Sequence, residues 1–171
     1  RTNYQPTDAF SMSFNIEYAN MFDRTQYVTE TSGVAVNKDT RYILGRIQNQ
    51  TLTTTLRLNY SFTPDISLQF YGQPFISKGR YTDLNYVLNP TGNSIKDRIS
   101  VYNDQQISFK NEVYTIDENT DGVADYSFSN PDFSFTQLQT NLVARWEYIP
   151  GSELFLVWSR GSVGDAPISD D

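Results

Sequence analysis

Apolar and polar residues alternate with a period of two along four segments of the chain. These segments are Phe10–Tyr18, Leu52–Phe62, Ile66–Tyr71 and Leu138–Tyr148. Successive side chains of a β-strand point to opposite faces, so each segment has one apolar face and one polar face. No segment shows a comparable 3.6-residue period. The pattern therefore predicts an all-β chain, with tight turns at Thr63–Asp65 and Pro150–Ser152.

Weaker signals surround these segments. We expect further strands near Gln26–Thr31 and Tyr42–Ile47, and short strands around Ile99–Tyr102 and Ile107–Tyr114. The alternation fades over residues 74–131, and a connection of that length is usually functional or partly disordered. We interpret it as a long surface loop within a single region, 1–171, because no domain boundary or low-complexity linker is visible.

Two architectures explain the alternation. In a soluble sandwich the apolar face is the core, whereas in an outer-membrane barrel it meets lipid and the polar face lines the lumen. Three features favour an antiparallel up-and-down outer-membrane β-barrel. The strands reach the length that crosses a bilayer, the short turns lie at one end of the strands, and the apolar faces end in aromatics typical of a membrane interface. These aromatics are Tyr60, Phe62, Trp146 and Tyr148.

The polar faces carry the residues that would point into a lumen. These are Glu17, Arg57, Gln69, Tyr71, Arg145 and Glu147. They suit a polar pathway or a sugar-binding wall with Tyr71 as a stacking surface, and equally a structural network that braces the interior. A glycoside hydrolase needs two carboxylates about 5–10 Å apart. Glu17 and Glu147 are the acids in clear strand positions, and nothing in the sequence brings them together.

The composition removes several functions. The 171 residues include no His and no Cys, which excludes Cys/His zinc sites, Ser-His-Asp catalysis and disulfides. We therefore expect no enzyme activity built on those groups. The net charge of −7 argues against a nucleic-acid partner. No apolar run approaches the roughly 18 residues of a membrane-spanning helix.

One loop has the spacing of a calcium site. Its ligands would be Asp117, Asn119, Asp121, the Val123 carbonyl and Asp125, with Gly122 at the sharp turn. The bidentate Glu expected at the twelfth position is replaced by Phe128. We therefore expect weak calcium binding, with a dissociation constant of about 10⁻⁴–10⁻³ M. The alternative is a solvated Asp/Asn-rich turn.

Longer strings add a resemblance. The segments Arg57–Asp65, Leu68–Tyr81 and Asn141–Trp158, with the strings LQFYGQPF and RWEYIPGS, resemble a Gram-negative domain-of-unknown-function family. Its members join a carbohydrate-binding family 9-like domain to a C-terminal outer-membrane barrel. The resemblance implies the outer membrane as location, and the lipid bilayer, glycans or other outer-membrane subunits as partners. The resemblance implies a C-terminal part of a larger barrel. The chain ends in DAPISDD rather than in a strand that finishes in an aromatic residue, so we expect an interior piece of a longer protein.

Overall fold

The computed structural model describes residues 1–31 and 40–165 of the chain. These residues form ten β-strands and one short helix. The main strands are β1 (Thr2–Thr7), β2 (Phe10–Thr31), β3 (Arg41–Thr63), β4 (Ile66–Val87), β9 (Phe133–Ile149) and β10 (Ser152–Gly164). The short elements are α1 (Ile95–Arg98), β5 (Ile99–Val101), β6 (Ile107–Lys110), β7 (Val113–Ile116) and β8 (Tyr126–Ser129). The predicted all-β class is confirmed.

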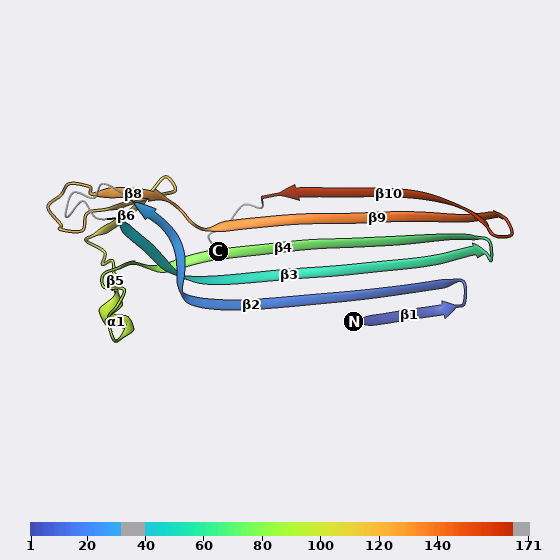
Figure 1. Ribbon diagram of the computed structural model, residues 1–171, viewed down its shortest axis with the longest axis horizontal. Coiled ribbons are helices and arrows are strands. Elements are labelled where there is room, and N and C mark those ends of the chain that lie inside the picture. The colour runs from blue at the N-terminus through green and yellow to red at the C-terminus, as the bar shows by residue number, and fades with distance from the viewer. Residues whose placement is uncertain (32–39, 166–171) are drawn as a thin grey trace. The chain divides into compact units, whose positions relative to one another are not determined.

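The main sheet has the strand order β1-β2-β3-β4-β9-β10, with β5 paired to β4 (Figure 1). A second sheet has the order β6-β7-β8. The strand pairs with a described register are antiparallel. Neighbours in the main sheet are mostly consecutive in the chain, as in an up-and-down arrangement. In the described residues β1 pairs only with β2 and β10 only with β9, so the sheet has two edges.

The chain divides into two compact units. Unit 1 comprises Arg1–Asn20, Gln50–Lys78 and Ser134–Asp171, and unit 2 comprises Met21–Asn49 and Gly79–Phe133. The segment that the sequence presents as a long loop therefore contains the end of β4, α1 and β5–β8. It is more regular than its fading alternation indicates, because strands of three or four residues are too short to give a periodic signal.

Unit 2 has a hydrophobic core of its own. Its buried apolar side chains come from segments far apart in the sequence: Ile43, Leu84, Tyr102, Ile116 and Phe128. Around them pack further aromatic side chains, among them Tyr81, Tyr86, Tyr114 and Tyr126. Phe109, Tyr114 and Phe128 lie opposite one another across β6, β7 and β8, and their rings stack in a row.

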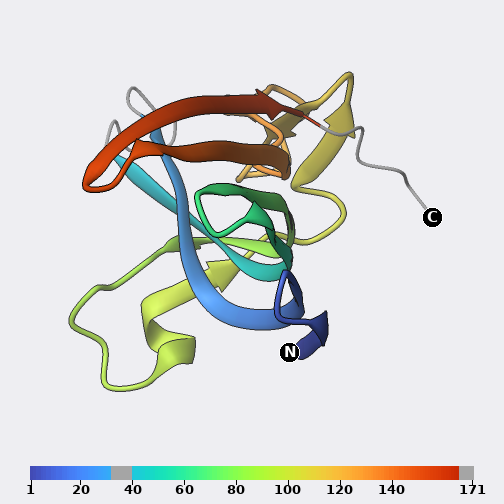
Figure 2. The same ribbon diagram turned by 90° about the vertical axis from the view of Figure 1, so that its right-hand side faces the viewer.

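Unit 1 is built differently. Figure 2 shows its strands as a single curved layer with β1 and β10 at the edges. Among its described residues the buried ones are Gly72, Ser77 and Ser134, and none is a large apolar residue. The apolar side chains of the alternating pattern are present but uncovered. For example, Ile16 is 58%, Phe62 59% and Leu156 72% exposed.

The β9–β10 register assigns side chains to the two faces of unit 1. Trp146 lies opposite Leu154 and Leu142 opposite Trp158, so these side chains share the apolar face. Arg145 lies opposite Phe155 and Val143 opposite Val157 on the other face. The sequence leaves this register open, because Leu154–Trp158 is apolar on both faces.

Candidate functional site on the polar face of unit 1

Arg145 forms an ion network at the end of β9. Its Nε and Nη2 donate to Glu153 Oε1 at 2.9 and 2.6 Å, and Nη2 also donates to Glu147 Oε2 at 3.0 Å. The second oxygen of Glu147 accepts a hydrogen bond from the Gly151 amide at 2.9 Å. The structure thus brings together Arg145 and Glu147, as the polar-face interpretation expects, and adds Glu153, which the sequence does not single out. The network contains one cation and two carboxylates, so it has a net negative charge.

Arg57 occupies a different environment. Its guanidinium carbon lies over the Tyr71 ring, 5.3 Å from the centroid, in a cation–π contact. The Tyr71 hydroxyl donates to Gln73 Oε1 at 2.8 Å, which fixes the ring. None of the ion pairs in the described part of the chain includes Arg57.

A hollow of about 290 Å³ surrounds this stack. Its lining residues are Arg57, Asn59, Gln69, Phe70, Tyr71, Asn141 and Val143. Three of the predicted polar-face residues, Arg57, Gln69 and Tyr71, therefore meet at one place. A neighbouring hollow of about 220 Å³ contains Glu17 together with Arg57. Asn59 and Asn141 belong to the first hollow although the sequence does not predict them; their place on the polar faces is the signal that could have found them.

The structure does not bring the two candidate hydrolase acids together. Glu17 is on β2 and Glu147 on β9, with β3 and β4 between them in the sheet. Three strand spacings amount to about 14 Å along the sheet, more than the separation that acid–base hydrolysis needs. Glu17 accepts a hydrogen bond from Asn15, and Glu147 is held by Arg145 and Gly151.

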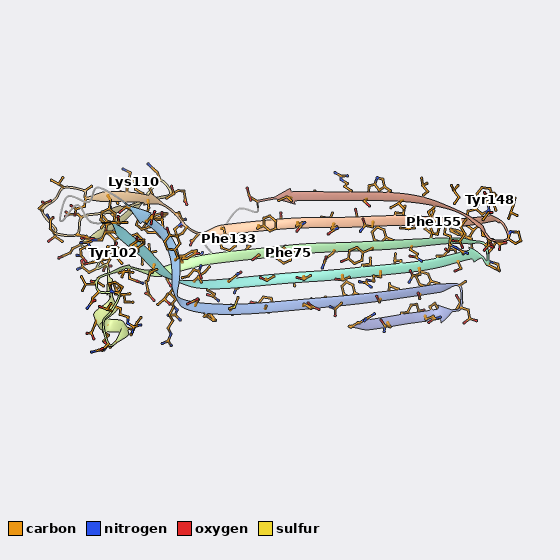
Figure 3. All side chains as sticks on the ribbon, viewed as in Figure 1. Phe75, Tyr102, Lys110, Phe133, Tyr148 and Phe155 are labelled. Carbon is orange, nitrogen blue, oxygen red and sulfur yellow. The ribbon has the colours of Figure 1, made fainter. Side chains whose placement is uncertain are left out.

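The four predicted interface aromatics lie near the hairpin turns. Tyr60 and Phe62 are in edge contact with ring centroids 4.6 Å apart, and Trp146 and Tyr148 with centroids 6.0 Å apart. Both pairs are exposed, with exposed fractions of 41% to 59%. The Glu147 amide donates to the Asp65 carbonyl, which joins β9 to the β3–β4 turn. Figure 3 shows Tyr148 at this turn end of the strands.

The Asp-rich loop connects β7 to β8 in unit 2. Asp117 accepts hydrogen bonds from the Asp121 and Gly122 amides, and Asp121 accepts one from the Val123 amide. Asp125 accepts a bond from the Glu118 amide at 2.7 Å. Thr120 and Gly122 have positive φ angles of 58° and 87°, which tighten the turn. Within the described ranges, no three acidic side chains converge closely enough to hold a metal by themselves.

A buried network anchors that loop, and the sequence gives no sign of it. Arg41 Nε and Nη2 donate to the Glu118 carboxylate at 2.9 and 3.1 Å. The Tyr126 hydroxyl donates to Glu118 Oε1 at 2.6 Å and lies 2.7 Å from the Tyr102 hydroxyl. Burial is the main cause that raises the pKa of Tyr102 and of Tyr126 well above the ordinary tyrosine value. Both hydroxyls therefore stay neutral into the alkaline range.

No helix within the described residues is long and apolar enough to cross a membrane.

The fold and the polar face thus define an antiparallel, all-β sheet protein with a one-layered unit. Residues 1–166 match the family model described as Domain of unknown function (DUF5916). The chain belongs to this family. Comparison with curated proteins and with solved structures gives no match.

Proposed function

We propose that this chain is part of an outer-membrane β-barrel of a Gram-negative bacterium. The apolar face of unit 1 meets lipid, and the polar face borders an aqueous interior. The observation that carries the proposal is the absence of a covering layer: among the described residues of unit 1 no large apolar side chain is buried. A one-layered sheet that exposes this much apolar surface to water is unstable, whereas lipid removes the same surface from water.

The other features of unit 1 are consistent with this environment. The parts of β2, β3 and β4 that lie in unit 1 are residues 10–20, 50–63 and 66–78, and each reaches the 9–11 residues that a tilted strand needs to cross hydrocarbon. Aromatic pairs lie at the turn end, and Arg57 and Arg145 lie on the polar face. Arg160 is an exception, because it shares the apolar face of β10 with Trp158. A soluble sandwich module requires a second sheet over the apolar face, and the described part of unit 1 provides none.

The role that this architecture supports is transport, surface anchoring or glycan handling at the cell surface. The polar face has amides, arginines and paired acids but no assembled catalytic group in the described residues, so the proposal includes no reaction. The binding partners would be the bilayer and, on the polar side, glycans or other outer-membrane subunits.

Detergent dependence tests the proposal. The full-length protein should fractionate with outer membranes, require detergent for extraction, and migrate differently on gels before and after boiling. A protein that is monodisperse in plain buffer contradicts the proposal, because its apolar face would then be covered by protein. An unrelated periplasmic protein from the same cells controls for incomplete fractionation.

We also propose weak calcium binding at the β7–β8 loop. What supports it is the spacing of Asp117, Asn119, Asp121 and Asp125, together with the tight turn at Gly122. The metal would order the exposed middle of the loop, since Glu118 and Asp125 already fix its ends.

A further inference from the structure

Arg57 and Arg145 both lie on the polar face of unit 1, and their hydrogen bonds differ. Arg145 donates from Nε and Nη2 to Glu147 and Glu153. Arg57 takes part in no ion pair among the described residues and contacts the face of Tyr71 instead. A cation–π contact uses no N–H group as a hydrogen-bond donor to a carboxylate, so the guanidinium can still form two parallel hydrogen bonds with an anion. Arg57 can therefore bind a planar anion such as a carboxylate.

The residues around Arg57 favour a ligand that has hydroxyl groups as well as a negative charge. The hydrogen bond from Tyr71 to Gln73 holds the stacking ring, which pre-orients the guanidinium. Three carboxamides, those of Asn59, Gln69 and Asn141, line the same hollow. A carboxamide both donates and accepts hydrogen bonds, as recognition of sugar hydroxyls requires. No acidic side chain lines this hollow.

We propose that the Arg57 hollow binds an acidic sugar, with the sugar carboxylate on Arg57 and its hydroxyls on the carboxamides. The hollow contains one cation, so it suits a carboxylate better than a doubly charged phosphate. Its volume of about 290 Å³ is at the lower end for ligand sites, which fits one sugar ring. The inference rests on the proposed function, in which the polar face borders water.

The test is a titration of the full-length protein in detergent micelles with galacturonate. The readout is the ¹⁵N–¹H resonance of arginine Nε, and the Arg57 signal is the one absent from the Arg57→Lys variant. We expect this signal to shift and saturate with a dissociation constant on the order of 1 mM. Neutral galactose and acetate should each bind at least about tenfold more weakly, because each lacks one of the two recognised features.

Variants separate recognition by Arg57 from general charge. Binding to variants is followed by saturation transfer from protein to galacturonate. Arg57→Lys keeps the charge but loses the planar fork, so binding should weaken about tenfold, and Arg57→Gln should abolish it. Arg160→Gln is the matched control, because Arg160 shares the opposite face of β10 with Trp158 and should bind galacturonate unchanged.

Two results would overturn the inference: acetate binding as tightly as galacturonate, or Arg57→Lys binding like the parent protein. A separate result would contradict the proposed membrane location: a protein that is monodisperse without detergent. The same titration is then run in plain buffer, and its outcome decides the Arg57 site independently of the membrane assignment.

Discussion

Arg41 and Arg46 lie on the same strand, β3, and each forms one ion pair in unit 2. The Arg41–Glu118 pair is buried, with side chains 14% and 6% exposed, whereas the Arg46–Asp83 pair is 3.6 Å apart with side chains 49% and 63% exposed. Removing one partner of a buried pair leaves an uncompensated charge away from water, while an exposed charge remains solvated. Two arginines on one strand therefore differ in their contribution to stability.

Arg41→Ala should lower the free energy of unfolding by about 3–5 kcal/mol. Arg46→Ala, the matched control, should cost less than about 1 kcal/mol. Denaturant unfolding of the full-length protein, followed by near-ultraviolet circular dichroism of the tyrosine cluster, measures both. Equal costs for the two variants would show that Glu118 is not buried as described.

The ion pair between Arg41 and Glu118 could not be predicted from the sequence alone. Arg41 and Glu118 are 77 positions apart, and no local pattern links them. By contrast, the alternation of the sequence predicts that Arg57, Gln69 and Tyr71 lie on one side of the sheet, and all three line one hollow in the structure. The stacking of Arg57 on Tyr71 depends on how β3 and β4 pair, and one chain's alternation does not specify side-chain distances.

At the scale of elements, the strands that alternate cleanly are the ones that the sequence predicts. The predicted segments Tyr42–Ile47 and Leu52–Phe62 are parts of one strand, β3, because residues between them continue the sheet without alternating. β1 and β8 are not predicted, since β1 is polar and β8 has four residues.

A polar contact favours one β9–β10 register, whereas the apolar residues of β10 are compatible with either register. In the observed register Glu153 lies opposite Glu147, and Arg145 bonds to both. A shift by one residue would move Glu153 to the apolar face beside Trp146 or Tyr148. Burying that charge against lipid is costly, and this favours the observed pairing.

The β7–β8 connection carries the calcium prediction. With a dissociation constant of about 10⁻⁴–10⁻³ M, 10 mM calcium should stabilise the loop by about 1.4–2.7 kcal/mol. Protection of residues 117–125 from proteolysis, and a shift of the Gly122 amide resonance, measure this effect. Asp117→Asn should remove it, whereas Asp104→Asn, an exposed acid outside the loop, should not. An unchanged loop at 10 mM calcium would identify it as a solvated turn.

At the scale of the whole molecule, the two units differ in what stabilises them. Unit 2 buries Ile43, Leu84 and Ile116 within its own strands, so its core is complete without a partner. Unit 1 buries no large apolar side chain in its described residues and relies on its surroundings for that contribution. The alternating pattern predicts one apolar and one polar face for unit 1. It does not reveal what covers the apolar one, since lipid and a packed core select the same residues.

The two tryptophans can report what covers the apolar face. Trp146 and Trp158 both lie on that face and are both 50% exposed. Trp158 pairs with Leu142, four residues along β9 from Trp146. That spacing is about 14 Å along the strand, or about 10 Å of depth for a strand tilted by 35–45°. Trp146, near the turn, should therefore lie shallow in the bilayer and Trp158 close to its centre.

Lipids brominated at different depths of the acyl chain quench tryptophan fluorescence on contact, which makes this difference measurable. In Trp158→Phe, the remaining Trp146 should be quenched best by bromine near the headgroups. In Trp146→Phe, Trp158 should be quenched best by bromine deep in the chains. A soluble sandwich would protect both tryptophans from every brominated lipid, because protein would cover them. A peripheral protein resting on the surface would give shallow quenching for both, so the order of depths distinguishes a spanning sheet from either alternative.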